Sequence, residues 1–463
     1  MHRGLTTNFS YLKTKTVMAK KDRDGSSNEF GRVSTSVDEL LLAALERDDN
    51  SMETGRYIVT LKEGAGEQGA QTFSTQGMRV ADSRDFADQA TVLESLGDAD
   101  ALLFSEIGAA LVSGPVAQER GLSAFAEVAS DSPIASVDPE YFVFSSAVYE
   151  EYAEQTATDG NQTESYLRGF LKAAETISKD LSNGKSALIS DYEEAQALGA
   201  TWGLNVCRVP PSVRSGAGIR VAVLDTGFDL GHPDFLGRPI VGQTFVGQPV
   251  QDLHSHGTHC VGTACGPKAP VGTTPRYGIA HRSAIFVGKV LSNTGGSVGG
   301  SVLAGMNWAI ANRCTVISMS LGGQGGVQPS FTAAGNAALN NGLLIVAAAG
   351  NSNASTGFPA NSPSIMSVAS LGPGLAPSPF SNFGKIDISG PGEGVFSSVP
   401  RPARYGTKSG TSMATPHVAG CAALWAETSP NLRGMALWRQ LQRTARPLRF
   451  PPARVGAGLV QAP

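Results

Sequence analysis

The chain has few charged side chains and only five cysteines in 463 residues. Charged residues make up 16% of it, against about 25% in typical soluble domains. Because the cysteines are odd in number and widely spread, the sequence argues against a full disulfide framework. With 36 basic and 40 acidic residues, the net charge is −4. No basic surface is implied, so we expect no nucleic-acid partner.

Long hydrophobic runs are also missing. The longest covers seven residues, 343–349, whereas a membrane span needs about 18 to 20, so we expect no membrane span. The N-terminal segment shows no apolar stretch of the kind that a secretory signal requires, and it therefore indicates no compartment. Residues 1–21 carry five basic side chains and no acidic one, which fits either a transit-like segment or a plain disordered tail.

Glycine, by contrast, is abundant, with 55 residues that lie mostly after position 200. Such an excess suits a fold with many tight turns between strands and helices. Apolar strands and helical segments alternate over this part, which predicts an α/β fold with a doubly wound, mostly parallel sheet. We expect strands to end at Asp225, Val290, Met319 and Ala349, and helices to cover 256–265, 302–313 and 331–340.

Three segments carry side chains suited to nucleophilic catalysis. Four apolar residues place Asp225 at the C-terminal end of a predicted strand. His256 opens a run of small residues that is compatible with a helix. Ser412 lies in Gly410-Thr411-Ser412-Met413-Ala414-Thr415-Pro416-His417, where a glycine turn leads into an apolar helix. Its hydroxyl would therefore sit at the positive end of a helix dipole, where developing negative charge is stabilised.

The order of acid, base and nucleophile along the chain is the order found in subtilisin. Further blocks at 318–323, 346–351 and 456–460 occur in the matching order. Together these segments resemble the signature blocks of the subtilisin-like serine peptidases, the subtilases, over residues 200–463.

The resemblance implies a serine endopeptidase that acts on polypeptide substrates and requires no cofactor. It implies Asp225, His256 and Ser412 as the catalytic residues, and Asn351 as the oxyanion-hole donor together with the backbone N–H of Ser412. Structural calcium is a habit of the family, and Asp234 resembles a common calcium ligand. The loop from Gly266 lacks the usual asparagine-rich ligands, however, so we nominate no metal site.

The resemblance also indicates how a substrate would bind. An extended peptide would form main-chain hydrogen bonds as a strand between two edges of the protein. A pocket bounded by 321–323, 347–349 and Gly357 carries no charge, which favours an apolar or aromatic residue before the scissile bond. We expect the main-chain partners to be Ser320, Leu321 and Gly322 on one edge and Gly296 and Ser297 on the other.

A separate α+β unit is predicted upstream, over residues 57–145. Its pattern of strand, helix, strand, strand, helix, strand, with helices near 84–96 and 122–129, is a ferredoxin-like order. Through Tyr57-Ile58-Val59 and Val137-Asp138-Pro139-Glu140 it resembles the subtilase propeptide, which is an intramolecular chaperone and inhibitor of its own enzyme. Autocatalytic cleavage would then fall between Ser145 and Thr201.

The predicted organisation therefore has four parts. The polar sequence of residues 1–55, which is rich in turn-forming residues, predicts a disordered tail with one helical patch near 37–46. The segment after the propeptide-like unit is acidic and helical in pattern, and we interpret it as a linker or insert. The parts are the tail (1–55), the propeptide-like domain (57–145), the helical linker or insert (146–200) and the peptidase domain (201–463).

Two other functions remain open from the residues alone. A zinc hydrolase could use Asp252, His254, His256 and His259, although Thr258 stands where the usual zinc pattern has aspartate. A catalytically silent scaffold that binds peptides is the second alternative. Each of the proposed site residues also has an ordinary structural role, such as a helix cap for the serine or a turn residue for the asparagine.

Overall fold

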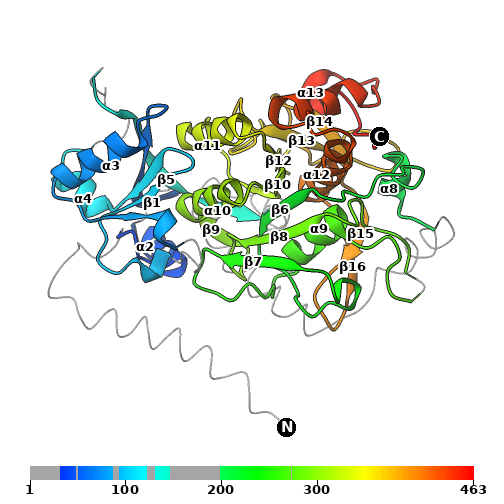
Figure 1. Ribbon diagram of the computed structural model, residues 1–463, viewed down its shortest axis with the longest axis horizontal. Helices are drawn as coiled ribbons and strands as arrows, with labels where there is room; N and C mark the ends of the chain where they lie inside the picture. The colour runs from blue at the N-terminus through cyan, green and yellow to red at the C-terminus, as the bar shows by residue number, and fades with distance from the viewer. Residues whose placement is uncertain (1–31, 48–50, 87–92, 123–130, 146–198, 273) are drawn as a thin grey trace, which may run out of the picture.

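The structure is a computed structural model that describes residues 32–47, 51–86, 93–122, 131–145, 199–272 and 274–463 (Figure 1). The helix predicted at 122–129 and nearly all of the 146–200 segment lie outside these described residues. Among the described residues, no helix combines the length and apolar character needed to cross a bilayer.

Seven parallel strands form the central sheet of the C-terminal part, which confirms the predicted α/β fold. Residues after Thr201 therefore form alternating strands and helices, as the pattern of apolar runs predicted. In spatial order the strands are β14 (Ile388–Pro391), β13 (Met366–Leu371), β12 (Leu344–Ala348), β10 (Val316–Met319), β6 (Arg220–Asp225), β8 (Ala284–Lys289) and β7 (Ile240–Thr244). A hairpin of β15 (Val395–Ser398) and β16 (Tyr405–Lys408) lies outside this sheet.

Both faces of the sheet are covered by helices. Successive side chains of a strand point to opposite faces, so each strand contributes to the packing on both sides. Val221 and Val223 of β6 belong to one apolar cluster, whereas Ala222 and Leu224 belong to another. The first cluster contains α9 and α12, and the second contains α10 and α11. The helices are α8 (Trp202–Val206), α9 (His256–Cys265), α10 (Gly299–Ala311), α11 (Pro329–Asn340), α12 (Thr411–Thr428), α13 (Gly434–Thr444) and α14 (Pro452–Val455).

The N-terminal unit is a second sheet with the strand order β5-β1-β4-β3-β2. Neighbouring strands among the first four are antiparallel, which is the ferredoxin-like arrangement that the strand pattern predicted. Its elements are β1 (Glu53–Leu61), α3 (Gly66–Thr75), β2 (Val80–Asp82), β3 (Ala101–Phe104), β4 (Ala109–Val112), α4 (Gly114–Glu119) and β5 (Ile134–Ser145).

The first helix of this unit is misplaced in the sequence prediction. It is α3, at 66–75, whereas the predicted helix at 84–96 contains only two short 3₁₀ turns, Ser83–Phe86 and Leu93–Leu96, within the described residues. Helix α3 contains glycine and threonine, which have low helix propensity. It forms because Phe73 is fully buried against the sheet, which is a tertiary interaction that local pattern does not reveal.

Residues 32–47 also differ from the predicted tail. The helical patch is present as α2 (Val37–Arg47), but Val33 and Leu40 are fully buried, and α2 contacts both β1 and β9 (Gly296–Val298). The carbonyl of Val33 accepts a hydrogen bond from Arg56, 2.9 Å away. The segment is therefore part of the packed structure, since its apolar side chains recur at helical spacing and face the same core.

A buried ion pair lies where the two sheets meet. Arg56 Nε is 2.6 Å from Glu140 Oε2, and neither side chain is exposed. Glu140 Oε1 accepts a hydrogen bond from the Gly300 N–H at the start of α10, 2.7 Å away. A carboxylate at the positive end of a helix is stabilised by the helix dipole, so this contact fastens β5 to the C-terminal part.

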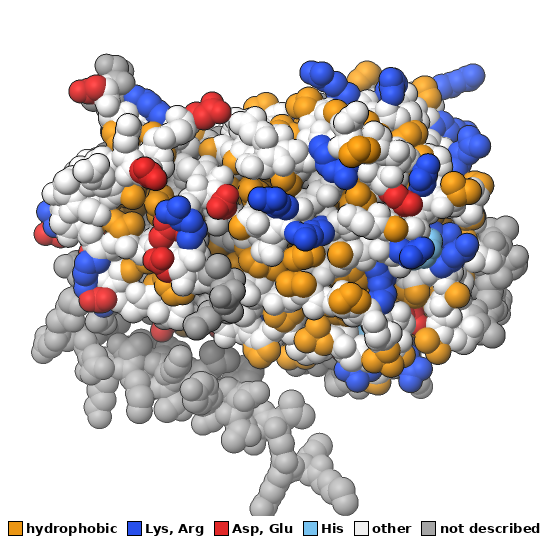
Figure 2. Space-filling model, in the orientation of Figure 1, with side chains coloured by type: hydrophobic (Ala, Val, Ile, Leu, Met, Phe, Trp, Pro, Cys, Tyr) orange, Lys and Arg blue, Asp and Glu red, His pale blue; other side chains and the backbone are white. Residues whose placement is uncertain are grey.

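The two units differ in surface charge on the face drawn in Figure 2. Most acidic side chains visible there lie over the N-terminal unit, whereas Lys and Arg predominate over the opposite end of the molecule.

The units lie side by side in Figure 1, with α10 and α11 next to the N-terminal sheet. A single apolar cluster continues from one unit into the other, so the contact between them is a packed core.

We predict that Leu40→Ala weakens the N-terminal unit, whereas Leu42→Ala on the same helix does not. Leu40 is 0% exposed and Leu42 is 48% exposed. Truncating a buried leucine removes apolar burial and leaves a cavity, which typically costs about 2 to 5 kcal/mol. Hydrogen exchange of the β1 amides, in a chain that carries Ser412→Ala, measures the difference. Equal protection in the two variants would contradict the packing of α2 described above.

Candidate active site

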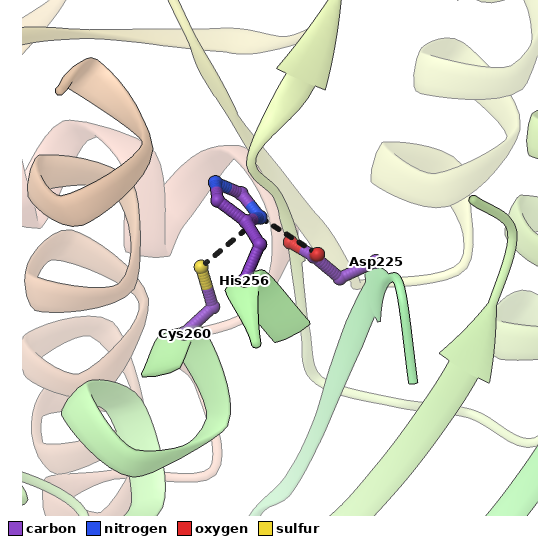
Figure 3. Close-up of side chains that lie close together, drawn as sticks. All are labelled: Asp225, His256 and Cys260. Atoms are coloured by element: carbon purple, nitrogen blue, oxygen red, sulfur yellow. Dashed lines mark hydrogen bonds and ion pairs between the residues drawn. The ribbon is translucent and has the colours of Figure 1, made fainter. Parts of the chain in front are cut away.

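Asp225 and His256 are brought together at the C-terminal edge of the central sheet (Figure 3). Asp225 is the last residue of β6, and His256 is the first residue of α9. His256 Nδ1 lies 2.8 Å from Asp225 Oδ1, and both side chains are buried. An ionised carboxylate can only accept, so Nδ1 carries the proton and Nε2 keeps its lone pair. Among the described residues, Nε2 has no hydrogen-bond partner.

A second buried carboxylate, Asp252, shapes the loop that leads to His256. It accepts five hydrogen bonds, which come from Thr226 Oγ1, the N–H groups of His254, Ser255 and Thr258, and Thr258 Oγ1. Burial opposes its ionisation, but these donors, led by Thr258, outweigh burial and hold the pKa of Asp252 below its usual value. The loop is thereby fixed immediately before the first turn of α9.

Ser412 occupies the first turn of α12. The helix follows Gly410, whose φ of 147° lies in a region that favours glycine. Pro416 has no N–H group, so the carbonyl of Ser412, four residues earlier, receives no helical hydrogen bond from it. That carbonyl accepts instead from Ser320 Oγ, at 2.8 Å, and from the thiol of Cys260, at 3.6 Å.

Cys260 lies between the Asp225–His256 pair and the first turn of α12. It is fully buried, and its Sγ lies 4.0 Å from His256 Nδ1 (Figure 3). The same sulfur also contacts the Ser412 carbonyl. Helices α9 and α12 therefore meet beside the Asp225–His256 pair. Burial raises the pKa of the Cys260 thiol well above its ordinary value, which keeps the sulfur neutral and argues against a reactive thiolate.

The hydroxyl of Ser412 is not hydrogen-bonded to His256 in this structure. It donates to the carbonyl of Ser320, 3.2 Å away, and Ser412 is 1% exposed. The structure thus brings the helix that carries Ser412 to the Asp225–His256 pair, but with the hydroxyl on a different acceptor. Such contacts are often long or poorly aligned before a substrate is bound.

Asn351 lies directly beside the start of α12. Its Oδ1 accepts from both the N–H and the hydroxyl of Thr411, each at 2.8 Å. Because both hydrogen bonds go to the oxygen, the orientation of the amide group is fixed relative to the residue that precedes Ser412. Asn351 is buried and lies just beyond the end of β12, at the same edge of the sheet as Asp225.

Strand β5 of the N-terminal unit lies between two short edges of the C-terminal part. It pairs with β9, where Phe144 faces Gly296 and Val143 faces Ser297. On its other side it pairs with β11 (Leu321–Gly322), where Leu321 faces Ser145. The five edge residues singled out from the sequence therefore comprise four that bracket β5, together with Ser320, which contacts Ser412.

A small pocket adjoins the β11 edge. Its lining contains no charged side chain. Gly357 belongs to it, and a Cβ built on that residue would lie 2.3 Å from the carbonyl oxygen of Gly323, so only glycine permits this approach. The lining residues are Leu321, Gly322, Gly323, Gln324, Ala348, Ala349, Gly350, Asn351, Gly357 and Phe358.

His254 and His259, which the zinc alternative requires, do not form a common metal site with His256 in the described part of the chain. His259 Nε2 lies 2.8 Å from the carbonyl oxygen of Val395, and both nitrogens of buried His254 have no partner among the described residues. Burial lowers the pKa of His254 to about 3, so it is neutral at ordinary pH. In the described part of the chain, the one group of potential metal ligands is Asp225, His256 and Cys260. The neutral thiol and the Asp225–His256 hydrogen bond make that group a poor zinc site.

Asp234 is also not arranged as a cation ligand. Its carboxylate accepts from the N–H of Val271, at 2.8 Å, and from the hydroxyl groups of Tyr277 and Tyr405. These donors occupy the oxygens that calcium would need. Burial, together with the nearby Asp234 charge, raises the pKa of Tyr405 to about 12, so its hydroxyl keeps its proton.

Sequence reasoning missed two residues at this edge, Thr226 and Lys289. Thr226 donates from its N–H to Asp225 Oδ1, at 2.7 Å, and from its hydroxyl to Asp252, at 3.0 Å. Lys289, the last residue of β8, is fully buried and donates to the carbonyl of Thr226. A charged residue ending an apolar strand next to the strand of Asp225 was the available signal.

Comparison with known proteins identifies relatives of the C-terminal part. A family model described as the Subtilase family matches residues 216–458. Subtilisin from Bacillus pumilus is 38% identical over 240 residues, which are 50% of this chain and 85% of that protein. Alkaline elastase YaB from Bacillus sp. (strain YaB) is 38% identical over 280 residues, which are 59% and 71% of the two chains.

Two further similarities agree with these. Subtilisin E from Bacillus subtilis (strain 168) is 37% identical over 240 residues, and the match spans 50% of this chain and 61% of that protein. Among solved structures, a cold adapted subtilisin-like serine proteinase matches with a TM-score of 0.51 and 33% identity, covering 57% of this chain and 98% of the other. The family match includes the whole seven-stranded parallel sheet.

Proposed function

Because this chain belongs to the subtilase family and is a serine-type endopeptidase, we propose that Asp225, His256 and Ser412 form its catalytic triad. The main support for this triad is the geometry of the Asp225–His256 pair. The buried Asp225–His256 hydrogen bond of 2.8 Å lies against α12, whose first turn contains Ser412, and it leaves His256 Nε2 without another partner among the described residues. An imidazole held in this way can accept a proton from a hydroxyl.

Each member of the triad has a distinct task. His256 Nε2 takes the proton of Ser412 as the hydroxyl attacks the peptide carbonyl, and then gives it to the leaving amine. Asp225 stays ionised, keeps the imidazole in the required tautomer and stabilises its cation. The Ser412 hydroxyl must move from the Ser320 carbonyl to His256 for the first step, which requires rotation about its Cα–Cβ bond. Subtilisins need no catalytic cofactor, and none enters these steps.

The tetrahedral intermediate carries a negative oxygen that needs hydrogen-bond donors. We propose the side-chain amide of Asn351 and the N–H of Ser412 for this task. The support is the position of Asn351 beside Thr411, with its amide oxygen held by the two Thr411 donors. The position of Ser412 in the first turn of α12 adds the positive end of the helix dipole.

We propose that substrates bind as a strand between β9 and β11, at Gly296, Ser297, Leu321 and Gly322, with Ser320 at the end nearest Ser412. The support is that β5 of the same chain occupies this place with antiparallel pairing on both sides. The uncharged pocket beside Leu321, which includes Gly357, would take the side chain before the scissile bond.

We further propose that residues 57–145 are a propeptide that blocks the cleft until the chain cuts itself. Strand β5 fills the groove that a substrate would need, and it ends at Ser145, where the pairing with β11 ends. The hydrogen bond from the Gly300 N–H of α10 to Glu140 of β5, together with the shared apolar core, holds the unit in place. Cleavage would fall in the interval between Ser145 and Thr201.

We predict that Ser412→Ala abolishes both self-cleavage and hydrolysis of a denatured casein-like protein. Loss of the nucleophile lowers kcat by about 10⁶-fold in subtilisin itself, and a similar loss is expected here. Mass spectrometry of purified full-length protein measures the cut, with Ser429→Ala at the other end of α12 as the control. Cleavage of the purified Ser412→Ala chain between residues 145 and 201 would rule out self-processing.

For Asn351→Leu we expect a fall in kcat of about 10²- to 10³-fold, with little change in KM. The variant removes a donor that acts only on the transition state, and such a donor contributes about 3 to 4 kcal/mol in subtilisin-type enzymes. Steady-state kinetics on a chromogenic peptide measures it, with Asn336→Leu on the exposed side of α11 as the control. A change confined to KM would assign Asn351 to binding instead.

A series of peptides that differ only in the residue before the scissile bond tests the pocket. We expect kcat/KM for Ala, Leu or Phe to exceed that for Lys or Glu by at least about 10-fold, because no charge in the lining compensates a buried ionic group. If the Lys or Glu peptide were the best substrate, the pocket beside Leu321 would not be the specificity pocket.

A further inference from the structure

Lys289 is a buried cation at the edge of the sheet where Asp225 lies. It is 0% exposed, and in the parallel pairing of β6 with β8 it stands opposite Asp225. Lysine is almost never fully buried unless its ammonium group is well compensated. Its position beside the proposed triad therefore calls for an explanation in terms of the site.

The ammonium group connects three segments that meet at the site. Lys289 Nζ donates to the carbonyl of Thr226 and to Asn293 Oδ1, the latter at 2.8 Å. Asn293 Oδ1 also accepts from the N–H of Leu253, at 3.4 Å, in the loop that leads to His256. The adjacent turn, through the 2.9 Å hydrogen bond from Ser292 N–H to the Gly296 carbonyl, leads directly into the β9 edge.

Thr226 transmits this anchoring to the acid and the base. Its N–H donates to Asp225 Oδ1 at 2.7 Å, and its hydroxyl accepts from the N–H of Gly257, next to His256, at 2.8 Å. The same hydroxyl donates to Asp252. Holding the carbonyl of Thr226 therefore restrains the residue whose N–H orients the Asp225 carboxylate and whose hydroxyl contacts the start of α9.

The charge of Lys289 also balances two buried carboxylates. Asp225 and Asp252 are 1% and 0% exposed, yet within the described ranges no carboxylate lies within ion-pair distance of Lys289 Nζ. Burial lowers the pKa of Lys289 to about 8, while the charges of Asp252 and Asp225 oppose that shift. Ionisable groups around this cluster are, besides these three, His254, His256, His259, Cys260 and Lys408.

We infer that Lys289 is a positioning residue for the proposed catalytic pair: it holds Thr226 in place behind Asp225, and its positive charge offsets the two carboxylates behind His256. The inference rests on the proposed triad. Lys289 touches neither substrate nor the reacting atoms, and it acts through the groups that it orients and through its field.

Removing the charge of Lys289 should shift the dependence of kcat/KM on pH in one direction. Lys289 stands opposite Asp225, whose carboxylate contacts His256, so its positive charge opposes the field that favours the imidazolium form, and removing that charge favours protonation of the imidazole. The neutral base is then lost at a higher pH, and the acid limb of the profile of kcat/KM against pH moves upward, by about 0.5 to 1 pH unit. A purely structural role for Lys289 would lower stability without moving this limb.

Four variants of the full-length chain, each allowed to process itself, separate charge from anchoring. Lys289→Gln keeps a group that can donate to Thr226 and Asn293 but has no charge, Lys289→Met removes both properties, and Lys289→Arg keeps the charge. Lys385→Met is the control, because the partly buried Lys385 also donates to a carbonyl group and a carboxylate, but contacts none of the triad. The measurement is kcat/KM on one chromogenic peptide from pH 5 to pH 10, with thermal unfolding alongside.

We expect the acid limb to move upward in Lys289→Gln and Lys289→Met, and to stay near its original position in Lys289→Arg and Lys385→Met. The loss of kcat should be larger for Met than for Gln, since only Met releases the Thr226 carbonyl. An unmoved limb in the Gln variant, or an equal shift in Lys385→Met, would overturn the inference. Failure of the triad itself is distinguishable, because then Ser412→Ala would keep the activity of the unsubstituted enzyme.

Discussion

Two buried carboxylates at one edge of the parallel sheet determine how the surrounding loops are built. Burying a charge without partners costs several kcal/mol, so each must be surrounded by donors. Asp252 accepts five hydrogen bonds, one from Thr226 and four from residues 254–258. Asp225 accepts from Thr226 and His256, and Lys289 lies behind both carboxylates. The orientation of His256 is a result of satisfying these charges, and the proposed chemistry depends on that orientation.

The same edge explains how the two units of the chain are coupled. Antiparallel pairing needs only main-chain groups, so the gap between β9 and β11 can accept β5 regardless of most of its side chains. The contact of Glu140 with the start of α10 and the continuous apolar core add specific interactions. Inhibition by the N-terminal unit and recognition of substrates would thus use the same hydrogen-bonding edges, and a bound propeptide would exclude a substrate.

Local sequence pattern predicted some elements well and others badly, for identifiable reasons. The helix at 256–265 was predicted with its observed bounds, because the run after His256 consists mostly of small residues and contains no proline, although Gly257 and Gly262 lower its helix propensity. Helix α3 was missed, since its glycines and threonines give no local signal and burial of Phe73 stabilises it. The buried helix α2 was interpreted as part of a tail because its neighbours are polar, although Val33, Val37 and Leu40 face one core.

The sequence by itself determined the family, the α/β fold and the identity of the residues proposed for catalysis. Each of these residues lies in a short continuous motif, which can be recognised without knowledge of the fold. Only the tertiary structure decided which groups touch. It placed Asp225 against His256, left the Ser412 hydroxyl on the Ser320 carbonyl, and placed Lys289 opposite Asp225 and against the Thr226 carbonyl. Contacts at this site join residues up to 152 positions apart in the chain, as Cys260 and Ser412 are. They form where parallel strands end together, a relation that strand register sets and local sequence does not encode.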